Sequence, residues 1–590
     1  MRIRLKYVLL FILLLVFIPQ AYAEQRSNIY ELDAGEDIQT AIDNCAAGGC
    51  KIILASGTYT ITSAINFAST DDYIILEGSG PSTLITTATD SISLLTVTGV
   101  AGGDQALGIV VRDIRFTNTA STKTSTGISI TACDDCLFER LHTTTLTQAS
   151  NGVEIWLAGG SDRTIIRANT LVDWANRGIY LQGSSNDNII ADNLLTCSTG
   201  CAAAGIELYN DPARTTIKGN HIVQSTGAGH GIQIFRCPAN SCNEVTNGTF
   251  TGDASGWTLN SGWAYNSNND NVRHTGSGTG TMEQDIGVTA ADIRIGRRYS
   301  VTYTISSYVA GNVTVSLGGG TGQARSANGT YTEIFTPSST AVLAFTPASS
   351  ADLIIDTVIA GGEEPYETII SQNHIEWNGA TGTPIDIEGS RRGIISDNII
   401  TNVASSRVAI YIAERGEYNV PAYGWVITGN RCTEAFRCIG VYKSHNITIT
   451  GNNNYSVSDD DDFILLDQAT YVTITGNFSE LATGGSTEDH IVIGTTGAST
   501  DIMVSGNNFR GGDYGIEVVN GAVVANRVMV IGNVFTGGVT TAVNAADSND
   551  SNNWVVTTNT FPTTMTANIT GTDGNQDGAS VSIVNNYDDT

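Results

Sequence analysis

The sequence predicts an all-β protein whose main part is a parallel β-solenoid. Two residue patterns recur along the 590 residues with a period of about 26 residues. The composition includes 64 Gly and only 10 Pro, and 41% of the residues are apolar, which is enough for a large core. Many short strands joined by glycine-rich turns account for these observations.

The first pattern is a strand of the form Gly-Ile-x-Ile, in which alternate residues face the interior. The predicted first inward residues are Ile128, Val153, Ile179, Ile206, Ile232, Ile385, Ile410, Ile439, Ile464, Ile491 and Ile516. The second pattern places an asparagine after a short β run, at Asn169, Asn193, Asn220, Asn373, Asn398, Asn430, Asn452, Asn477, Asn507, Asn533 and Asn559. Such a repeat forms one solenoid rung, and a buried asparagine in each rung can hydrogen-bond to the rungs above and below.

Both patterns are interrupted by the same gap of 153 residues, which predicts an insertion between Ile234 and Thr368. Residues 299–305 and 312–317 alternate apolar and polar side chains, as antiparallel strands do. The predicted organisation is therefore a signal peptide at 1–23, solenoid at 24–243, a β-sandwich at 244–363 and solenoid again at 364–590.

The N-terminus has the layout of a secretory signal. Basic Arg2, Arg4 and Lys6 precede the apolar residues 8–18 and the small-residue site 21–23. We expect cleavage there, a secreted or periplasmic mature protein, and no membrane attachment afterwards. Residues 35–44 have apolar positions and early acidic residues that predict a short helix, which would cap the open end of the solenoid.

The ten cysteines agree with export, because they form five close pairs in sequence order. The predicted disulfides are Cys45–Cys50, Cys133–Cys136, Cys197–Cys201, Cys237–Cys242 and Cys432–Cys438. Zinc is the alternative for the Cys-x-x-Cys spacing at 133–136, although no second ligand pair lies near it in the sequence.

The stretches 37–42, 52–59, 76–80 and 82–85 resemble the opening of the pectin-lyase-like superfamily. This resemblance implies a right-handed parallel β-helix; the superfamily includes polysaccharide lyases, glycoside hydrolases, epimerases, tailspikes and adhesins. The insert, through 247–250, 255–258, 298–303 and 328–332, resembles jelly-roll carbohydrate-binding modules. Gly229-His230-Gly231 is similar to a polygalacturonase motif, whereas the preceding rungs carry Asn176-Arg177-Gly178 and Ala203-Ala204-Gly205 in place of the acidic motifs of that family.

The outward residues of the Gly-Ile-x-Ile strands are rich in acids, amides and aromatics on the middle rungs, as a saccharide-binding groove requires. The predicted substrate-binding residues are Glu154, Trp156, Tyr180, Gln182, Tyr209, Gln233, Phe235, Tyr411 and Tyr442. A solvated β-face with no ligand is the alternative.

Glu207, Asp386 and Glu388 are the predicted acid and base residues of a hydrolase. Glu207 and Asp386 lie two rungs apart, or about 9 to 10 Å at the backbone, which suits a pair of carboxyl groups that cleaves a glycosidic bond. A lyase or epimerase would instead need cations beside a uronate, and Arg391, Arg415, Lys443 and His445 are the candidates.

Asp573, Asn575 and Asp577 have the spacing of the start of a calcium loop, so calcium is the candidate cofactor. The net charge of −29 argues against binding nucleic acid. The sequence thus predicts a polysaccharide-cleaving hydrolase or lyase, monomeric or trimeric. The alternative is a non-catalytic glycan-binding surface, adhesion or tailspike-like protein.

Overall fold

The computed structural model describes most of the chain outside its N-terminus. The described residues are 28–45, 48–100, 104–123, 126–144, 146–147, 152–183, 185–198, 201–209, 212–225, 229–235, 245–286, 299–338, 342–362, 366–378, 381–415, 421–455, 462–481, 489–518, 525–544, 554–562, 567–570, 581–584 and 587–589. The predicted signal peptide, the pair Cys237 and Cys242, and the predicted calcium loop at 573–577 lie outside them.

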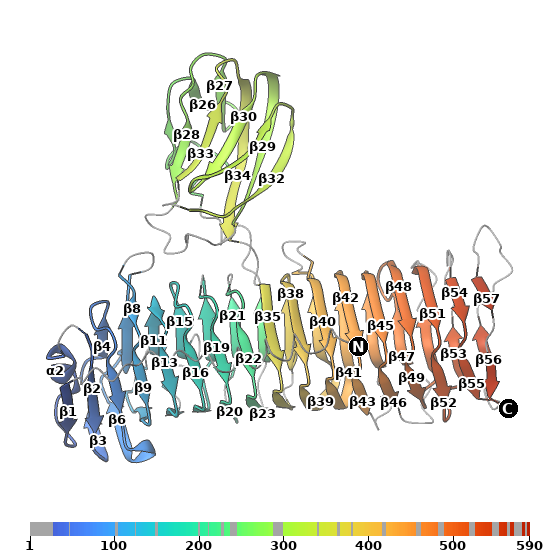
Figure 1. Cartoon of the computed structure of the whole chain (residues 1–590), viewed down its shortest axis with the longest axis horizontal. Helices are drawn as coiled ribbons and strands as arrows, with labels where there is room; N and C mark the ends of the chain where they lie inside the picture. Colours follow the sequence, from blue (N-terminus) through green and yellow to red (C-terminus); the bar gives the residue numbers. More distant parts are fainter. Residues whose placement is uncertain are drawn as a thin grey trace, which may run out of the picture.

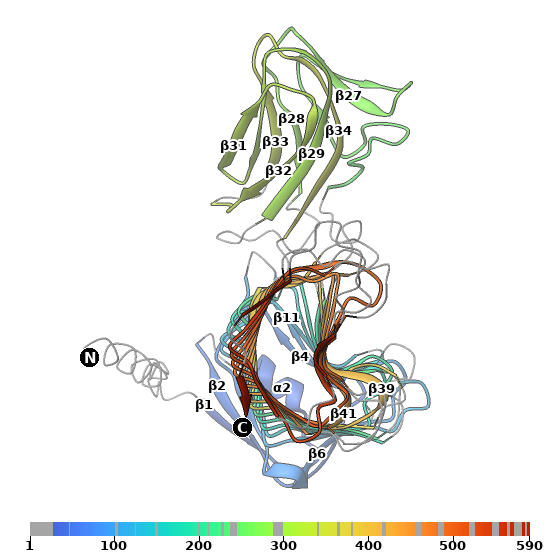
Figure 2. The ribbon, with the colours of Figure 1, turned by 90° about the vertical axis from the view of Figure 1, so that its right-hand side faces the viewer.

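Three ladders of parallel strands run the length of a solenoid (Figures 1 and 2). Ladder 1 consists of β1 (Asn28–Leu32), β2 (Cys50–Leu54), β5 (Ile75–Glu77), β9 (Val110–Arg112), β13 (Leu137–Glu139), β16 (Ile165–Arg167), β19 (Ile189–Ala191), β22 (Thr216–Lys218), β35 (Tyr366–Ser371), β38 (Arg391–Ser396), β40 (Tyr423–Thr428), β42 (His445–Thr450), β45 (Thr470–Thr475), β48 (Ser499–Ser505), β51 (Ala525–Ile531), β54 (Trp554–Thr557) and β57 (Val581–Val584). This architecture confirms the predicted parallel β-helix.

Ladders 2 and 3 complete each rung, and two long strands, β39 (Ile399–Ala413) and β41 (Arg431–Tyr442), run through both. Ladder 2 also contains β3 (Gly57–Thr60), β6 (Thr83–Thr87), β10 (Arg115–Asn118), β14 (His142–Thr144), β17 (Thr170–Val172), β20 (Leu194–Cys197), β23 (His221–Gln224), β36 (His374–Trp377), β43 (Asn453–Tyr455), β46 (Phe478–Glu480), β49 (Asn508–Arg510), β52 (Val534–Thr536), β55 (Thr560–Pro562) and β58 (Tyr587–Asp589). Ladder 3 also contains β4 (Ile65–Ala68), β7 (Leu95–Thr98), β11 (Thr126–Thr131), β15 (Val153–Ala158), β18 (Arg177–Gln182), β21 (Ala204–Tyr209), β24 (His230–Phe235), β37 (Ile385–Glu388), β44 (Asp462–Asp467), β47 (Asp489–Ile493), β50 (Tyr514–Val518), β53 (Thr541–Asn544) and β56 (Ala567–Thr570).

Glycine precedes the first inward isoleucine of several ladder 3 strands because the next rung leaves no room for a side chain. A Cβ on Gly178 would lie 2.6 Å from the carbonyl oxygen of Gly205, and one on Gly205 would lie 2.9 Å from that of Gly231. The isoleucines that follow, such as Ile179 and Ile206, are fully buried and stack on one another. The Gly-Ile-x-Ile pattern therefore reflects both the close approach of rungs and the continuous core.

The asparagine ladder forms as predicted. Asn193, for example, accepts hydrogen bonds through Oδ1 from the backbone and side-chain nitrogens of Asn169, at 3.0 and 2.9 Å. The same pair of bonds joins Asn220 to Asn373 across the insertion. Because each asparagine satisfies backbone groups at a turn between ladders 1 and 2, the polar column lies inside the protein without loss of hydrogen bonds.

The insertion forms a separate β-sandwich that extends from the middle of the solenoid (Figure 1). One antiparallel sheet has the order β25 (Thr258–Leu259), β28 (Met282–Asp285), β33 (Val342–Pro347), β30 (Val313–Leu317) and β31 (Gly320–Arg325). The other has the order β26 (Trp263–Asn266), β27 (Asn271–Thr275), β34 (Asp352–Gly362), β29 (Tyr299–Ala310) and β32 (Gly329–Phe335). The sandwich has its own hydrophobic core, distinct from that of the solenoid.

The predicted helix spans Ile38–Asp43 and is labelled α2 (Figure 2). The Asp37 side chain accepts from the backbone nitrogens of Gln39 and Thr40, and Ile38, Ala41 and Ile42 join the solenoid core. A helix of six residues gives no support for a helical cap as a structural unit. Within the described ranges, no helix is long and apolar enough to cross a membrane.

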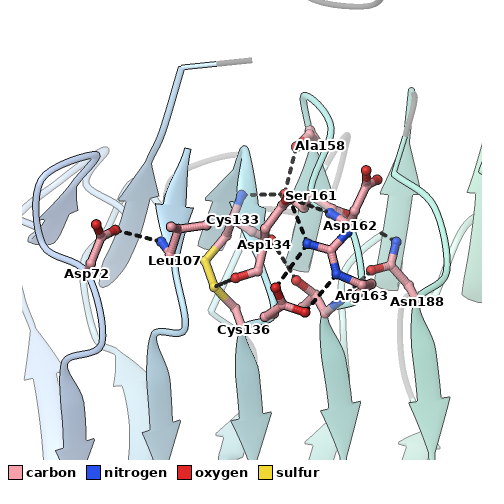
Figure 3. The surroundings of a disulfide bond; sticks show 12 residues. Asp72, Leu107, Cys133, Asp134, Cys136, Ala158, Ser161, Asp162, Arg163 and Asn188 are labelled. Atoms are coloured by element: carbon pink, nitrogen blue, oxygen red, sulfur yellow. Dashed lines mark hydrogen bonds and ion pairs between the residues drawn. A yellow bond between two sulfur atoms is a disulfide. The ribbon is translucent and has the colours of Figure 1, made fainter. Parts of the chain in front are cut away.

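Four of the five predicted disulfides are present: Cys45–Cys50, Cys133–Cys136, Cys197–Cys201 and Cys432–Cys438. Figure 3 shows Cys133–Cys136, which begins in β12 (Cys133–Asp134), the partner of β8 (Ala106–Leu107). Arg163 on the next rung pairs with Asp134 and Asp135 at 3.2 and 2.7 Å. Because both sulfur atoms are used in the bond, the alternative of zinc at this position is wrong.

A candidate active site on ladder 3

The outer face of ladder 3 carries three columns of side chains on its middle rungs. Strand register places Trp156, Tyr180, Glu207, Gln233, Asp386 and Tyr411 in one column, and Gln182, Tyr209, Phe235, Glu388 and Ala413 in the next. A third column precedes the glycines and contains Arg177, Ala204 and His230. All predicted substrate-binding residues except Glu154 lie in or beside these columns.

Glu154 is not on the outer face, so its predicted placement is wrong. Ile155, not Val153, pairs with Ile128 and Ile179, and Glu154 therefore occupies the glycine position of its rung. Its side chain is fully buried, and Oε1 accepts from the Leu146 nitrogen at 2.9 Å and from the Thr147 hydroxyl at 3.3 Å. With this register, Trp156 lies in the column of Tyr180, whereas the sequence pattern alone places it in the column of Gln182.

Burial raises the pKa of Glu154 from 4.5 to about 7. The folded protein therefore holds this proton more tightly than the unfolded chain, and stability falls as pH rises from about 4.5 to 7. We expect Glu154→Gln, which keeps the accepting oxygen, to be more stable than the wild type at pH 8 by about 3 kcal/mol but not at pH 4. Denaturant midpoints of both proteins at the two pH values test this; the exposed Glu480→Gln is the control. An identical pH dependence in wild type and Glu154→Gln would contradict it.

Glu207 and Asp386 are deeply buried acids of the outer face, with exposed fractions of 1% and 2%. Arg177 donates to Oε2 of Glu207 at 2.7 Å, and Gln233 donates to Oδ2 of Asp386 at 2.9 Å. Within the described residues, the second oxygen of each carboxyl group is buried and has no protein hydrogen-bond partner. Each acid therefore has one oxygen held by the protein and one buried oxygen without a hydrogen-bond partner in the described part of the protein.

Burial raises the pKa of both groups. For Asp386 it reaches about 7, although the Gln233 hydrogen bond and the Arg415 charge act in the opposite direction. For Glu207, burial also dominates, and the neighbouring Arg177 opposes it. His230 Nδ1 lies 3.3 Å from Oδ2 of Asp386 and accepts the backbone N–H of Thr383 at 3.2 Å. An accepting nitrogen beside Asp386 favours the neutral carboxyl group there.

Glu388 completes the acidic group at the end of β37. It pairs with Arg415, whose guanidinium carbon lies 4.4 Å from the centre of the Phe235 ring. Burial, followed by the nearby charge of Asp386, raises the pKa of Glu388. Tyr209 packs edge-on against Phe235 with ring centres 4.7 Å apart. Of the predicted aromatic platforms, Trp156, Tyr209, Tyr411 and Tyr442 are half-buried, whereas Tyr180 and Phe235 are buried.

The predicted cations of a lyase do not gather at this site. Arg391 begins β38 and His445 begins β42, both in ladder 1, and His445 lies 2.6 Å from the Thr470 hydroxyl. Lys443 pairs with Glu414 at 3.4 Å. Only Arg415 reaches the acids, and it is paired with Glu388.

Sequence reasoning missed Arg177 and His230 as site residues. The candidate site residues were taken from the positions after each glycine, because strict alternation would turn the residue before the glycine inward; His230 was noted only within the Gly-His-Gly motif. In each of these strands the glycine has no partner in the register, and the residue before it lies on the outer face. Arg177 therefore reaches Glu207, and His230 reaches Asp386. The residues directly before the glycines, Arg177 and His230, were the signal in the sequence that could have identified these two site residues.

A family model described as "Periplasmic copper-binding protein (NosD)" matches residues 55–283, which is less than half of the chain. No curated protein matches the sequence. Among solved structures, the Azotobacter vinelandii mannuronan C-5 epimerase AlgE6 A-module is 10% identical, with 95% of this chain and 99% of that chain covered and a TM-score of 0.37. The catalytic unit of a GH87 α-1,3-glucanase from Streptomyces thermodiastaticus is 10% identical, with 94% and 66% covered and a TM-score of 0.36. An alginate lyase from Paenibacillus sp. is 12% identical, with 79% and 99% covered and a TM-score of 0.33.

Proposed function

We propose that this chain is an exported enzyme that hydrolyses a polysaccharide on the outer face of ladder 3. The supporting observation is the pair Glu207 and Asp386, two buried carboxyl groups on the outer face, each with one oxygen free of protein partners. Burying two acids costs folding free energy. Packing of the solenoid alone does not require acids at these positions. Four disulfides, together with the secretory signal predicted from the sequence, support a location outside the cytoplasm.

Asp386 would be the general acid and Glu207 the general base. Asp386, with a pKa of about 7, is protonated in about half of the molecules at neutral pH and can then transfer its proton to the glycosidic oxygen. Arg177 holds one oxygen of Glu207 and opposes the rise in its pKa, so Glu207 is the acid that we assign to activate the attacking water. The two acids are two rungs apart, about 9 to 10 Å at the backbone, which leaves room for water and predicts inversion at the anomeric carbon.

Hydrolysis fits this site better than elimination from a uronate. A lyase needs an unpaired cation to neutralise the sugar carboxylate before the C5 proton is removed. In the described part of the site, Arg177 is paired with Glu207 and Arg415 with Glu388. Half-buried Trp156, Tyr209, Tyr411 and Tyr442 offer ring surfaces to sugars. We therefore propose a substrate with few or no carboxylates.

The test is to incubate the purified mature protein with neutral and uronate polysaccharides and to follow reducing ends and 4,5-unsaturated uronate absorbance together. We expect new reducing ends from a neutral polysaccharide, without the absorbance. Absorbance would replace the proposal with lyase chemistry. Glycan binding without either product would replace it with the non-catalytic adhesion or tailspike-like alternative.

A further inference from the structure

A second cluster of potential ligands lies on ladder 2, separate from the acids of ladder 3. His221 on β23 and His374 on β36 are direct neighbours in the strand register, although 153 residues separate them in sequence. Glu376 lies two residues further along β36. One ligand atom from each of the three side chains can lie within 4.8 Å of the others.

The ligand atoms of the three side chains lie close together. The imidazole rings are stacked, with centres 4.7 Å apart and planes inclined by 2°. Oε1 of Glu376 lies 3.0 Å from Nε2 of His221 and 3.8 Å from Nε2 of His374. Ligand atoms about 2.0 to 2.1 Å from a tetrahedral metal ion lie about 3.3 Å apart, which is between these two distances. Side-chain exposures of 35% to 43% leave the rings free to tilt toward a shared ion.

The backbone beneath the cluster is held in place. The amide of His221 donates to Asn193 and that of His374 donates to Asn220, at 2.8 and 2.9 Å. The asparagine ladder joins the two rungs immediately before the histidines. Leu194 and Ile399, at the same ladder position on the flanking rungs, are exposed apolar residues that compete for no ligand. The site is thus organised before any ion binds.

An ion pair alone does not explain this arrangement. One histidine suffices to hydrogen-bond Glu376, whereas Nε2 of the second imidazole also lies 3.8 Å from the same carboxylate oxygen. Two imidazoles and one carboxylate suit copper, nickel or zinc, while magnesium and calcium prefer oxygen ligands. We propose that His221, His374 and Glu376 bind one divalent transition-metal ion, with Cu²⁺ bound most tightly and with coordination positions open to water or a further ligand.

Metal binding here would join the two rungs from which the inserted sandwich leaves the solenoid. β23 precedes the insertion and β36 follows it. A bound ion would therefore link chain segments that are far apart in sequence, and stabilise the folded protein by mass action. The site is distinct from the proposed catalytic acids, so its occupancy can be tested without any substrate.

The experiment uses the mature chain with its affinity tag removed and its metals stripped by a chelator. Calorimetric titration with Cu²⁺, Ni²⁺ and Zn²⁺ should show one ion per chain, and excess Mg²⁺ should not displace it. We expect His374→Ala and Glu376→Gln to weaken Cu²⁺ binding at least tenfold. His445→Ala, which removes a half-buried histidine of ladder 1, is the matched control and should bind like the wild type.

Electron paramagnetic resonance of the Cu²⁺ form provides an independent measurement. Hyperfine splitting should report two imidazole nitrogens in the wild type and one in His374→Ala, with circular dichroism confirming that the variant is folded. The proposal is wrong if the wild type binds no stoichiometric Cu²⁺, if both ligand variants bind as tightly as the wild type, or if His445→Ala loses as much affinity as they do.

Discussion

Asp386→Asn is expected to lower kcat on the hydrolysed polysaccharide about a thousandfold and to leave KM nearly unchanged. The amide keeps the size of the side chain and can still occupy the position next to Gln233 and His230. It cannot, however, give a proton to the leaving oxygen. Glu207→Gln should have a comparable effect, because it removes the base. Initial rates over a range of substrate concentrations separate kcat from KM.

The pH profile distinguishes an acid catalyst from a residue that only holds the site together. Wild-type kcat should fall as pH rises above about 7, where Asp386 loses its proton. The residual rate of Asp386→Asn should lack this decline. Asp501→Asn is the control, since Asp501 pairs with Arg527 on ladder 1, away from the site. Full activity in Asp386→Asn would exclude the proposed role.

Asn373→Ala is expected to cost about 4 kcal/mol of local stability. Its side chain accepts from the backbone and side-chain nitrogens of Asn220, and donates to Ile217 and Asn398. Alanine would leave several of these buried groups without partners, each at a cost of about 1 to 3 kcal/mol. The loss is largest here because this asparagine also connects the rungs on either side of the insertion.

Hydrogen exchange measured by mass spectrometry can locate the effect. Amides of β22, β23, β35 and β36 should exchange about a thousandfold faster in Asn373→Ala, while those near the C-terminal end should change little. The control is Asn453→Ala, which alters a half-buried asparagine of ladder 2 next to Asn452. Unchanged protection around Asn220 would show that the asparagine ladder contributes little to stability.

Most of the solenoid could be predicted because its repeat is local. Each rung contains its own alternation, its turn asparagine and its glycine, so the period and the 153-residue gap were visible without any contact. The register of the rung that contains Glu154 was not visible in the sequence. Val153 and Ile155 are both apolar, and a shift of two residues preserves alternation, so only pairing with Ile128 and Ile179 settled where Glu154 lies.

The candidate site was predicted in part. Glu207, Asp386 and Glu388 lie on the outer face as expected, because their two adjacent columns follow directly from the repeat. The cations could not be assigned from sequence, since charge pairing depends on side-chain direction across neighbouring rungs. Arg177 reaches forward to Glu207, and Arg415 reaches back to Glu388.

The sequence by itself determined the fold class, the asparagine ladder, the inserted sandwich and the local disulfides that the structure describes. These features depend on residues within one rung or on a period that repeats along the chain. The tertiary structure alone decided which acids are buried, which cations they neutralise, and that His221 meets His374 across the insertion. Such relations depend on distances between rungs and on exclusion of water, and neither is a property of a local stretch of residues.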